Sequence, residues 1–244
     1  REKEDFWLMG EVIHGDYARW ANDETLHSVT NYELHKGLYS GHNDHNYFEI
    51  AHTIRREFDE NGGIYRGRTL YSFADNHDVD RLASKLVNKA HLFPEYTLLY
   101  TLPGIPSLYY GSEWGIEGRK QGGNDDPLRP ALFLREMEEL HGNEALIGHL
   151  RELGRIKKEL PALSYGKYRE LHLTNRQYAF ARILDEQAVI VAVNNDENWT
   201  QMSVPVPVAA GSCRDVFTGE EAAVDNGHIR LELPPFGSSV IKIN

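Results

Sequence analysis

Four short apolar runs in the first 110 residues constrain the fold of this chain most. They cover residues 6–13, 28–34, 69–73 and 105–110, with room for a helix and a loop between successive runs. Continuous apolar runs of this length are typical of parallel strands, which need long crossover connections. We therefore expect about four β/α units, with residues 6–13 forming a strand that is covered on both faces.

Helical periodicity fills most of the space around these runs. Apolar residues recur three and four positions apart over residues 46–58, 79–89, 95–102 and 143–160, which predicts four helices.

The pattern changes near residue 165 to short alternating segments such as 177–183, 188–193 and 202–206, separated by Asn-rich and Gly-containing turn signals. This is typical of an antiparallel β-sandwich. Pro161 cannot continue the preceding helix, so we expect one domain over residues 1–160 and a second over residues 161–244.

Composition excludes several classes of protein. The formal charge of −11 would repel nucleic-acid phosphates, and no apolar run approaches the length that spans a membrane. The single cysteine, Cys213, excludes an internal disulfide and favours a cytoplasmic location.

Polar residues close the apolar runs, where a (β/α) barrel carries its active groups. Glu11 ends the first run, and an apolar strand beside this carboxyl group would raise its pKa and suit it to general acid catalysis. The alternative is a solvated glutamate at the end of a strand.

Residues 73–81 carry the densest polar cluster, Phe-Ala-Asp-Asn-His-Asp-Val-Asp-Arg. Asp78 could stabilise a cationic sugar transition state while His77 binds hydroxyl groups. The alternative is that Asp75, Asn76 or Asp78 caps a helix that begins near Val79. A third segment, residues 104–115, ends a strand with two tyrosines, which suit either sugar stacking or the protein core.

Taken together and in order, Gly-Glu-Val-Ile at 10–13, Phe-Ala-Asp-Asn-His-Asp at 73–78 and Gly-Ile-Pro-Ser-Leu-Tyr-Tyr-Gly at 104–111 closely resemble signatures of the α-amylase family. Residues 28–32 and 122–130 resemble the family's sixth strand and the loop after its eighth. Residues 215–220 and 233–237 resemble its C-terminal sandwich. The resemblance implies an α/β fold that is the C-terminal half of a (β/α)8 TIM barrel, followed by an antiparallel all-β sandwich domain.

The resemblance also implies roles. Glu11 would be the acid/base and Asp78 the transition-state stabiliser of a retaining hydrolase that acts on α-glucosidic bonds of starch-type saccharides. The residues expected to bind substrate are His77, Asn76, His14, Tyr110 and Arg129. His14, Tyr17 and Trp20 lie just beyond Glu11 and could line the acceptor side, although a loop in any protein can hold such residues.

One catalytic carboxylate is missing from this set. A retaining mechanism needs a nucleophile, which in this family is an aspartate after the fourth strand, and no Gly-Phe-Arg-x-Asp-like segment occurs here. We therefore expect the isolated chain to be inactive. Its expected partners are an α-glucan or maltooligosaccharide and the N-terminal half of the same protein, with a homodimer as another way to cover the open barrel edges.

Other interpretations remain open. His42 and His45 could hold zinc, although a loop that leads into a helix explains them equally well. We expect no cofactor. The resemblance allows calcium in a full-length enzyme, but these residues do not support a calcium site. The rival function is a non-enzymatic carbohydrate-binding or structural module that uses sandwich aromatics, namely Tyr165, Tyr168, Tyr178 and Phe180. A catalytically dead transporter-associated relative is disfavoured by the presence of both Glu11 and Asp78.

Overall fold

The computed structural model describes residues 6–209 and 212–243. Four short parallel strands occur in its first part: β1 (Met9–Gly10), β2 (Ser28–Val29), β3 (Tyr71–Phe73) and β4 (Ile105–Ser107). β1 pairs with β2 and β3 with β4, and a bridge between Thr30 and Tyr71 joins the two pairs. The strands therefore lie side by side in chain order, as they do in part of a (β/α) barrel.

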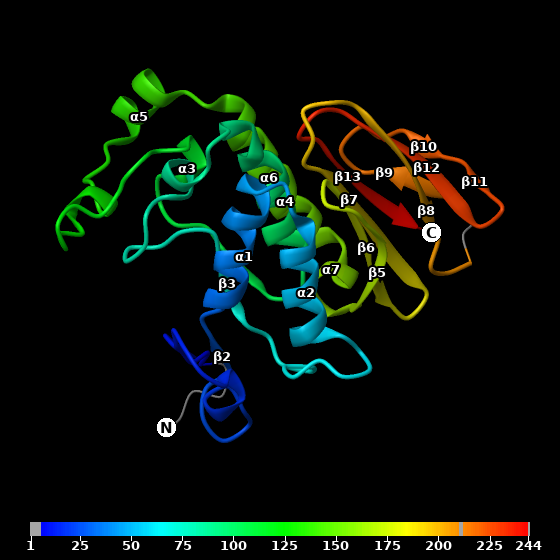
Figure 1. Cartoon of the computed structure of the whole chain (residues 1–244), viewed down its shortest axis with the longest axis horizontal. Coiled ribbons are helices and arrows are strands. Elements are labelled where there is room, and N and C mark those ends of the chain that lie inside the picture. The colour runs from blue at the N-terminus through cyan, green and yellow to red at the C-terminus, as the bar shows by residue number, and fades with distance from the viewer. Residues whose placement is uncertain (1–5, 210–211, 244) are drawn as a thin grey trace.

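Helices fill the connections and cover these strands (Figure 1). The α-helices are α1 (Tyr32–Asn43), α2 (Tyr47–Phe58), α3 (Leu82–Lys85), α4 (Leu92–Thr101), α5 (Leu134–His141), α6 (Glu144–Glu159) and α7 (Pro161–Tyr165). Short 3-10 helices cover Tyr17–Arg19, Lys89–His91, Ser112–Trp114 and Asp126–Leu128. None of the described helices has both the length and the hydropathy needed to cross a bilayer.

The apolar run at residues 28–34 is only partly a strand, because α1, a helix that the sequence pattern did not predict, begins at Tyr32. The Asn31 side-chain oxygen accepts a hydrogen bond of 2.9 Å from the Leu34 amide and so caps the helix. Tyr32, which follows Asn31, is therefore placed in the first turn of α1, at the carboxyl end of β2.

The prediction that residues 6–13 form a strand covered on both faces is wrong. Only Met9–Gly10 is a strand, Phe6 is 61% exposed, and Trp7, Leu8 and Met9 are also exposed. The physical reason is that β1 lies at an edge, where β2 is its strand neighbour within the described residues. These apolar side chains form an uncovered surface.

The second part is the predicted antiparallel sandwich. One sheet has the order β10-β9-β13-β7-β6-β5 and the other the order β11-β12-β8. The strands are β5 (Lys167–Leu173), β6 (Gln177–Leu184), β7 (Gln187–Asn194), β8 (Thr200–Pro205), β9 (Cys213–Asp215), β10 (Glu221–Ala222), β11 (Val224–Asp225), β12 (His228–Leu233) and β13 (Ser238–Ile243). Aliphatic side chains such as Ile190, Val204 and Ile229 fill the space between the sheets.

The central strands β6 and β7 of the six-stranded sheet are buried on both faces. Ala179 and Ile190 face the smaller sheet, while Tyr178, Phe180 and Val191 belong to the core formed with the helices. Helices α2, α4 and α7 lie against this second face (Figure 1). Because successive strand residues point to opposite faces, β6 and β7 supply side chains to two cores at once.

This packing determines which of the four sandwich aromatics are exposed to solvent. Tyr178 and Phe180 are fully buried and Tyr168 is nearly so, whereas Tyr165 is 79% exposed. Three of the four aromatics are therefore core residues and offer no platform to a sugar, which removes most of the support for a sandwich-based binding module.

The segment at His42–His45 joins the two parts of the chain. Asn195 of the sandwich donates hydrogen bonds to the Gly41 and His42 carbonyl oxygens, and His45 Nδ1 lies 2.7 Å from the Asn195 carbonyl. Burial lowers the pKa of His42 to about 3, so this imidazole is neutral. Within the described residues, no group of three or more His, Cys, Asp or Glu side chains could hold a metal ion.

A buried acid supports the start of α1. Glu57 of α2 is fully buried, and its Oε2 accepts a hydrogen bond of 2.7 Å from Asn31 Nδ2. Burial raises the pKa of Glu57 from 4.5 to about 7, against the opposing effect of the Asn31 hydrogen bond. The native state therefore favours the protonated form of Glu57.

We predict that Glu57→Gln removes a pH dependence of stability. Folding raises the pKa of Glu57, so protonated Glu57 adds to the free energy of unfolding. This contribution is complete below pH 4.5 and is lost as the pH rises from 4.5 to about 7. Urea unfolding at pH 8 should show the variant more stable by about 1–3 kcal/mol, with little difference at pH 4.5. The control is Glu24→Gln at an exposed position. If the free energy of unfolding of Glu57→Gln depended on pH as that of the unmodified chain does, Glu57 would not be the source of this pH dependence.

Candidate functional site

The carboxyl ends of the four parallel strands bring polar side chains together. Glu11 follows β1 directly, and the chain beyond it is tied to the end of β2. The Val12 amide donates to Thr30 Oγ1 at 2.9 Å, and Thr30 Oγ1 donates to the Val12 carbonyl at 3.1 Å. This pair of hydrogen bonds fixes the backbone beside Glu11.

Tyr32 links Glu11 to the segment that follows β3. Its hydroxyl donates to Glu11 Oε1 at 2.8 Å and accepts from Asn76 Nδ2 at 3.3 Å. The Tyr32 ring packs edge-on against Phe73, with 4.9 Å between ring centroids. Burial, and the neighbouring Glu11 carboxylate to a smaller extent, raise the pKa of Tyr32 to about 12, so this hydroxyl stays protonated near neutral pH.

Two neighbouring side chains share the capping role in the cluster at residues 75–78. Asp75 is buried, and its Oδ2 accepts from the Leu82 amide at 2.9 Å, at the start of α3. Asn76 Oδ1 accepts from the amides of Asp78 and Val79. Asp78 therefore keeps its carboxylate for other partners, and α3 begins later than the pattern predicts.

Asp78 pairs with Arg129, which lies in the long loop after β4. Arg129 Nη2 is 2.6 Å from Asp78 Oδ1, and Arg129 Nε donates to the His77 carbonyl at 3.0 Å. His77 Nε2 lies 3.4 Å from Asp78 Oδ2. These groups are partly exposed and lie together, as a ligand site requires. Tyr110 is held nearby through a hydrogen bond of 3.0 Å from its hydroxyl to the Pro130 carbonyl.

The residues just beyond Glu11 are less well placed. His14 and Trp20 are exposed, and the described residues show no hydrogen bond from the His14 side chain. Tyr17 is buried and stacks on Tyr65, with 5.3 Å between ring centroids. The expectation that Tyr17 lines an acceptor site is therefore wrong, because its ring belongs to the core.

A buried arginine organises the loops of the site. Arg81 donates to the Tyr110 carbonyl at 2.7 Å and to the Leu128 carbonyl at 2.8 Å. Its guanidinium carbon also lies 4.1 Å from the centre of the Tyr109 ring. One side chain thus joins the segment after β3 to two loops after β4 and fixes the backbone beside Tyr110 and Arg129.

Sequence reasoning assigned no role to Tyr32 or Arg81. Tyr32 lies near the end of the second apolar run, as Glu11 lies near the end of the first, so its position was a usable signal. Arg81 ends the polar cluster at 73–81, but its contacts lie 29 and 47 residues away and could not be inferred from spacing.

We predict that Arg81→Met destabilises the chain by about 3 kcal/mol, because it leaves the buried Leu128 carbonyl and the partly buried Tyr110 carbonyl without their donor. Urea unfolding measures the loss, and amide exchange at Ser112 and Leu128 should become faster. Arg129→Met is the matched control and should cost less than about 1 kcal/mol, because its ion pairs are solvent-exposed. Equal costs for the two variants would contradict the role of Arg81.

Comparison with known proteins agrees with this arrangement. A family model described as "Alpha amylase, catalytic domain" matches residues 1–163, and one described as "Maltogenic Amylase, C-terminal domain" matches residues 168–240. Neopullulanase 2 of Thermoactinomyces vulgaris is 28% identical over 97% of this chain and 40% of its own length. Maltogenic alpha-amylase of Bacillus acidopullulyticus is 24% identical over 95% of this chain and 39% of its own length. The chain spans about two fifths of the length of these relatives.

Solved structures share the fold. The α-amylase of Geobacillus thermoleovorans, complexed with acarbose, gives a TM-score of 0.81 at 22% identity over 99% of this chain and 54% of that one. A cyclomaltodextrinase gives a TM-score of 0.82 at 20% identity over 98% of this chain and 40% of that one. The first four strands thus correspond to part of the barrel, as predicted, and the chain belongs to the α-amylase family.

Proposed function

We propose that this chain supplies the acid/base and the transition-state stabiliser of a retaining glycoside hydrolase that cleaves α-glucosidic bonds in starch-type saccharides. The observation that carries the proposal is the hydrogen-bonded series from Glu11 through Tyr32 to Asn76 at the carboxyl ends of three neighbouring strands. Barrel enzymes assemble their active sites at this end of the sheet. The relatives' names, neopullulanase and maltogenic α-amylase, support the substrate class.

Glu11 is proposed as the acid/base. Tyr32 holds Oε1, which leaves Oε2 to deliver a proton to the glycosidic oxygen and later to take one from water. Because Tyr32 stays protonated near neutral pH, it remains a donor while Glu11 loses and regains its proton.

Asp78 is proposed to stabilise the oxocarbenium-like transition state, since a carboxylate beside the sugar ring favours positive charge there. Arg129 and the backbone at His77 fix its orientation. The groups proposed to bind sugar hydroxyls are His77, Asn76, His14, Tyr110 and Arg129. The nucleophile, a second carboxylate about 5–5.5 Å from the acid, is assigned to the family's fourth-strand aspartate, outside these residues.

The rest of the barrel is the proposed partner. The exposed apolar side chains at residues 6–9 lie on edge strand β1 and the segment that leads into it, where further strands would cover them. A homodimer that covers the same edge is the alternative. We further propose that residues 1–160 and 161–244 are two domains, supported by Pro161 at the break between α6 and α7.

The experiment measures release of reducing sugar from maltoheptaose by the chain alone and after mixing with the N-terminal part of a full-length relative. We predict no activity for the chain alone and activity in the mixture, lost at least about 1,000-fold in Glu11→Gln because that variant cannot deliver a proton. Size-exclusion chromatography establishes that the two parts associate. Activity of the chain alone, or an associated mixture that is inactive or unaffected by Glu11→Gln, would contradict the proposal.

A further inference from the structure

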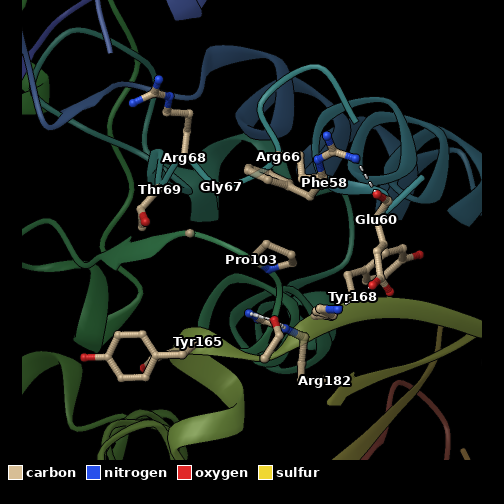
Figure 2. A pocket seen from close by; sticks show the side chains of 14 residues that line it. Phe58, Glu60, Arg66, Gly67, Arg68, Thr69, Pro103, Tyr165, Tyr168 and Arg182 are labelled. Atoms are coloured by element: carbon tan, nitrogen blue, oxygen red, sulfur yellow. Dashed lines mark hydrogen bonds and ion pairs between the residues drawn. The ribbon is translucent and has the colours of Figure 1, made fainter. Parts of the chain in front are cut away.

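A cavity of about 570 Å3 lies at the junction between the barrel part and the sandwich. Thr69 and Gly104, which line it, precede β3 and β4, so the cavity lies at the amino ends of these strands. The candidate active site lies at their carboxyl ends. Figure 2 shows Arg66 and Thr69 on one side of the cavity and Arg182 on the other.

Positive charge predominates in the walls of this cavity. The charged side chains that line it are Arg66, Arg68, Lys167, Arg182 and Glu60. Lys167 pairs with Glu60, and Arg68 pairs with Asp23. Arg66 donates to the Glu60 main-chain carbonyl at 2.8 Å, which does not neutralise its charge. Among the described residues, no carboxylate forms an ion pair with Arg66 or Arg182, so these two positive charges are uncompensated.

Arg182 is the buried member of this pair. It lies in β6 and is 2% exposed. Its Nε and Nη2 donate to the Gly166 carbonyl and its Nη1 to the Thr101 carbonyl, at 2.8–3.2 Å. A guanidinium has five N–H groups, so one further N–H remains on each of Nη1 and Nη2. Burial lowers the pKa of Arg182 to about 10, and the group stays charged near neutral pH. A buried charge without a counter-charge is strongly unfavourable, and an anionic ligand in the cavity would offset this cost.

Lys157 of α6 is a second buried cation near Arg182. Its Nζ donates to the Leu163 carbonyl at 2.8 Å and to the carbonyl of Gly104, a residue of the cavity wall, at 3.5 Å. Burial, and Arg182 to a smaller extent, lower the pKa of Lys157 to about 7. Two like charges therefore repel each other beside the cavity, and a bound anion would relieve this repulsion.

The donors of the cavity fit an oxyanion better than a neutral ligand. Guanidinium groups match the spacing of phosphate and carboxylate oxygens and bind them with pairs of hydrogen bonds. The Thr69 and Ser164 hydroxyls, also in the walls, can donate to further oxygens. A phosphate group has more oxygens than a carboxylate and carries up to two negative charges near neutral pH, enough to compensate both arginines. Because the whole chain has a formal charge of −11, binding of an anion here depends on this local cluster.

We propose that the cavity binds a phosphate group, either free phosphate or the phosphate of a small molecule, with Arg66 and Arg182 as its principal ligands. The bound group would connect the segment before β3, which carries Arg66, to strand β6 of the sandwich, which carries Arg182. This site is separate from Glu11 and does not depend on the proposed hydrolase activity.

The test is amide chemical-shift mapping on the isotope-labelled chain, titrated separately with inorganic phosphate, glycerol phosphate and maltoheptaose. A sodium chloride titration at matched ionic strength is the reference. We expect both phosphates to shift the amides of Gly67, Gly104 and Gly166, and maltoheptaose to leave them unchanged. Tighter binding of glycerol phosphate would identify a small-molecule phosphate as the ligand, whereas equal or weaker binding would identify free phosphate.

Two variants test the assigned ligands. Arg66→Gln changes an exposed residue, should fold normally and should weaken phosphate binding about fivefold. Arg182→Met should weaken it at least about tenfold, and Arg66→Gln decides the question if Arg182→Met does not fold. The matched control is Arg151→Gln, which removes an exposed cation outside the cavity walls and should leave the affinity unchanged.

Three outcomes would overturn the proposal: no shifts of the three glycine amides with either phosphate, equal shifts with sodium chloride, or affinity that is unaffected by Arg66→Gln. Equal shifts with sodium chloride would show that phosphate acts only by screening charges. Shifts of the same amides by maltoheptaose alone would also overturn the proposal and indicate a neutral ligand.

Discussion

The six-stranded sheet, packed on both of its faces, is the constraint on which the rest of the molecule depends. Its inner face completes the sandwich, while Tyr178, Phe180 and Val191 on the other face pack with α2, α4 and α7. Each fully buried aromatic removes about 150–250 Å2 from water. The short parallel strands have few ladder hydrogen bonds of their own, so the helices that carry them depend on this shared core for their position.

A few buried polar groups connect this core to the candidate site by hydrogen bonds. Glu57 on α2 holds Asn31, Asn31 caps α1, and α1 presents Tyr32 to Glu11. On the other side, Arg81 ties the loops that present Tyr110 and Arg129. The exposed groups proposed to act on substrate are thus held in position by buried groups, whose hydrogen bonds restrict their own side-chain conformations.

The sequence predicted the features that depend on local residue patterns. It did not predict the features that depend on contacts between distant segments. Polar residues that close apolar runs indicated Glu11 and Asp78, and alternation indicated the sandwich. Burial of residues 6–13 could not be predicted, because it depends on strands beyond β1. The alternation of Tyr178 and Phe180 could not distinguish an exposed face from one covered by helices, and the bridge by Tyr32 depends on three strands meeting at one end of a sheet.

The position of the candidate site therefore depends on the barrel part and the sandwich folding as a single cooperative unit. Four tryptophans allow a direct measurement, since Trp114 follows β4 and Trp199 precedes β8. Urea unfolding of the 5-fluorotryptophan-labelled chain, followed by fluorine NMR, reports on both parts in one sample. The shared core predicts one midpoint for the two signals. A Trp199 signal that stays native after Trp114 has unfolded would contradict the account.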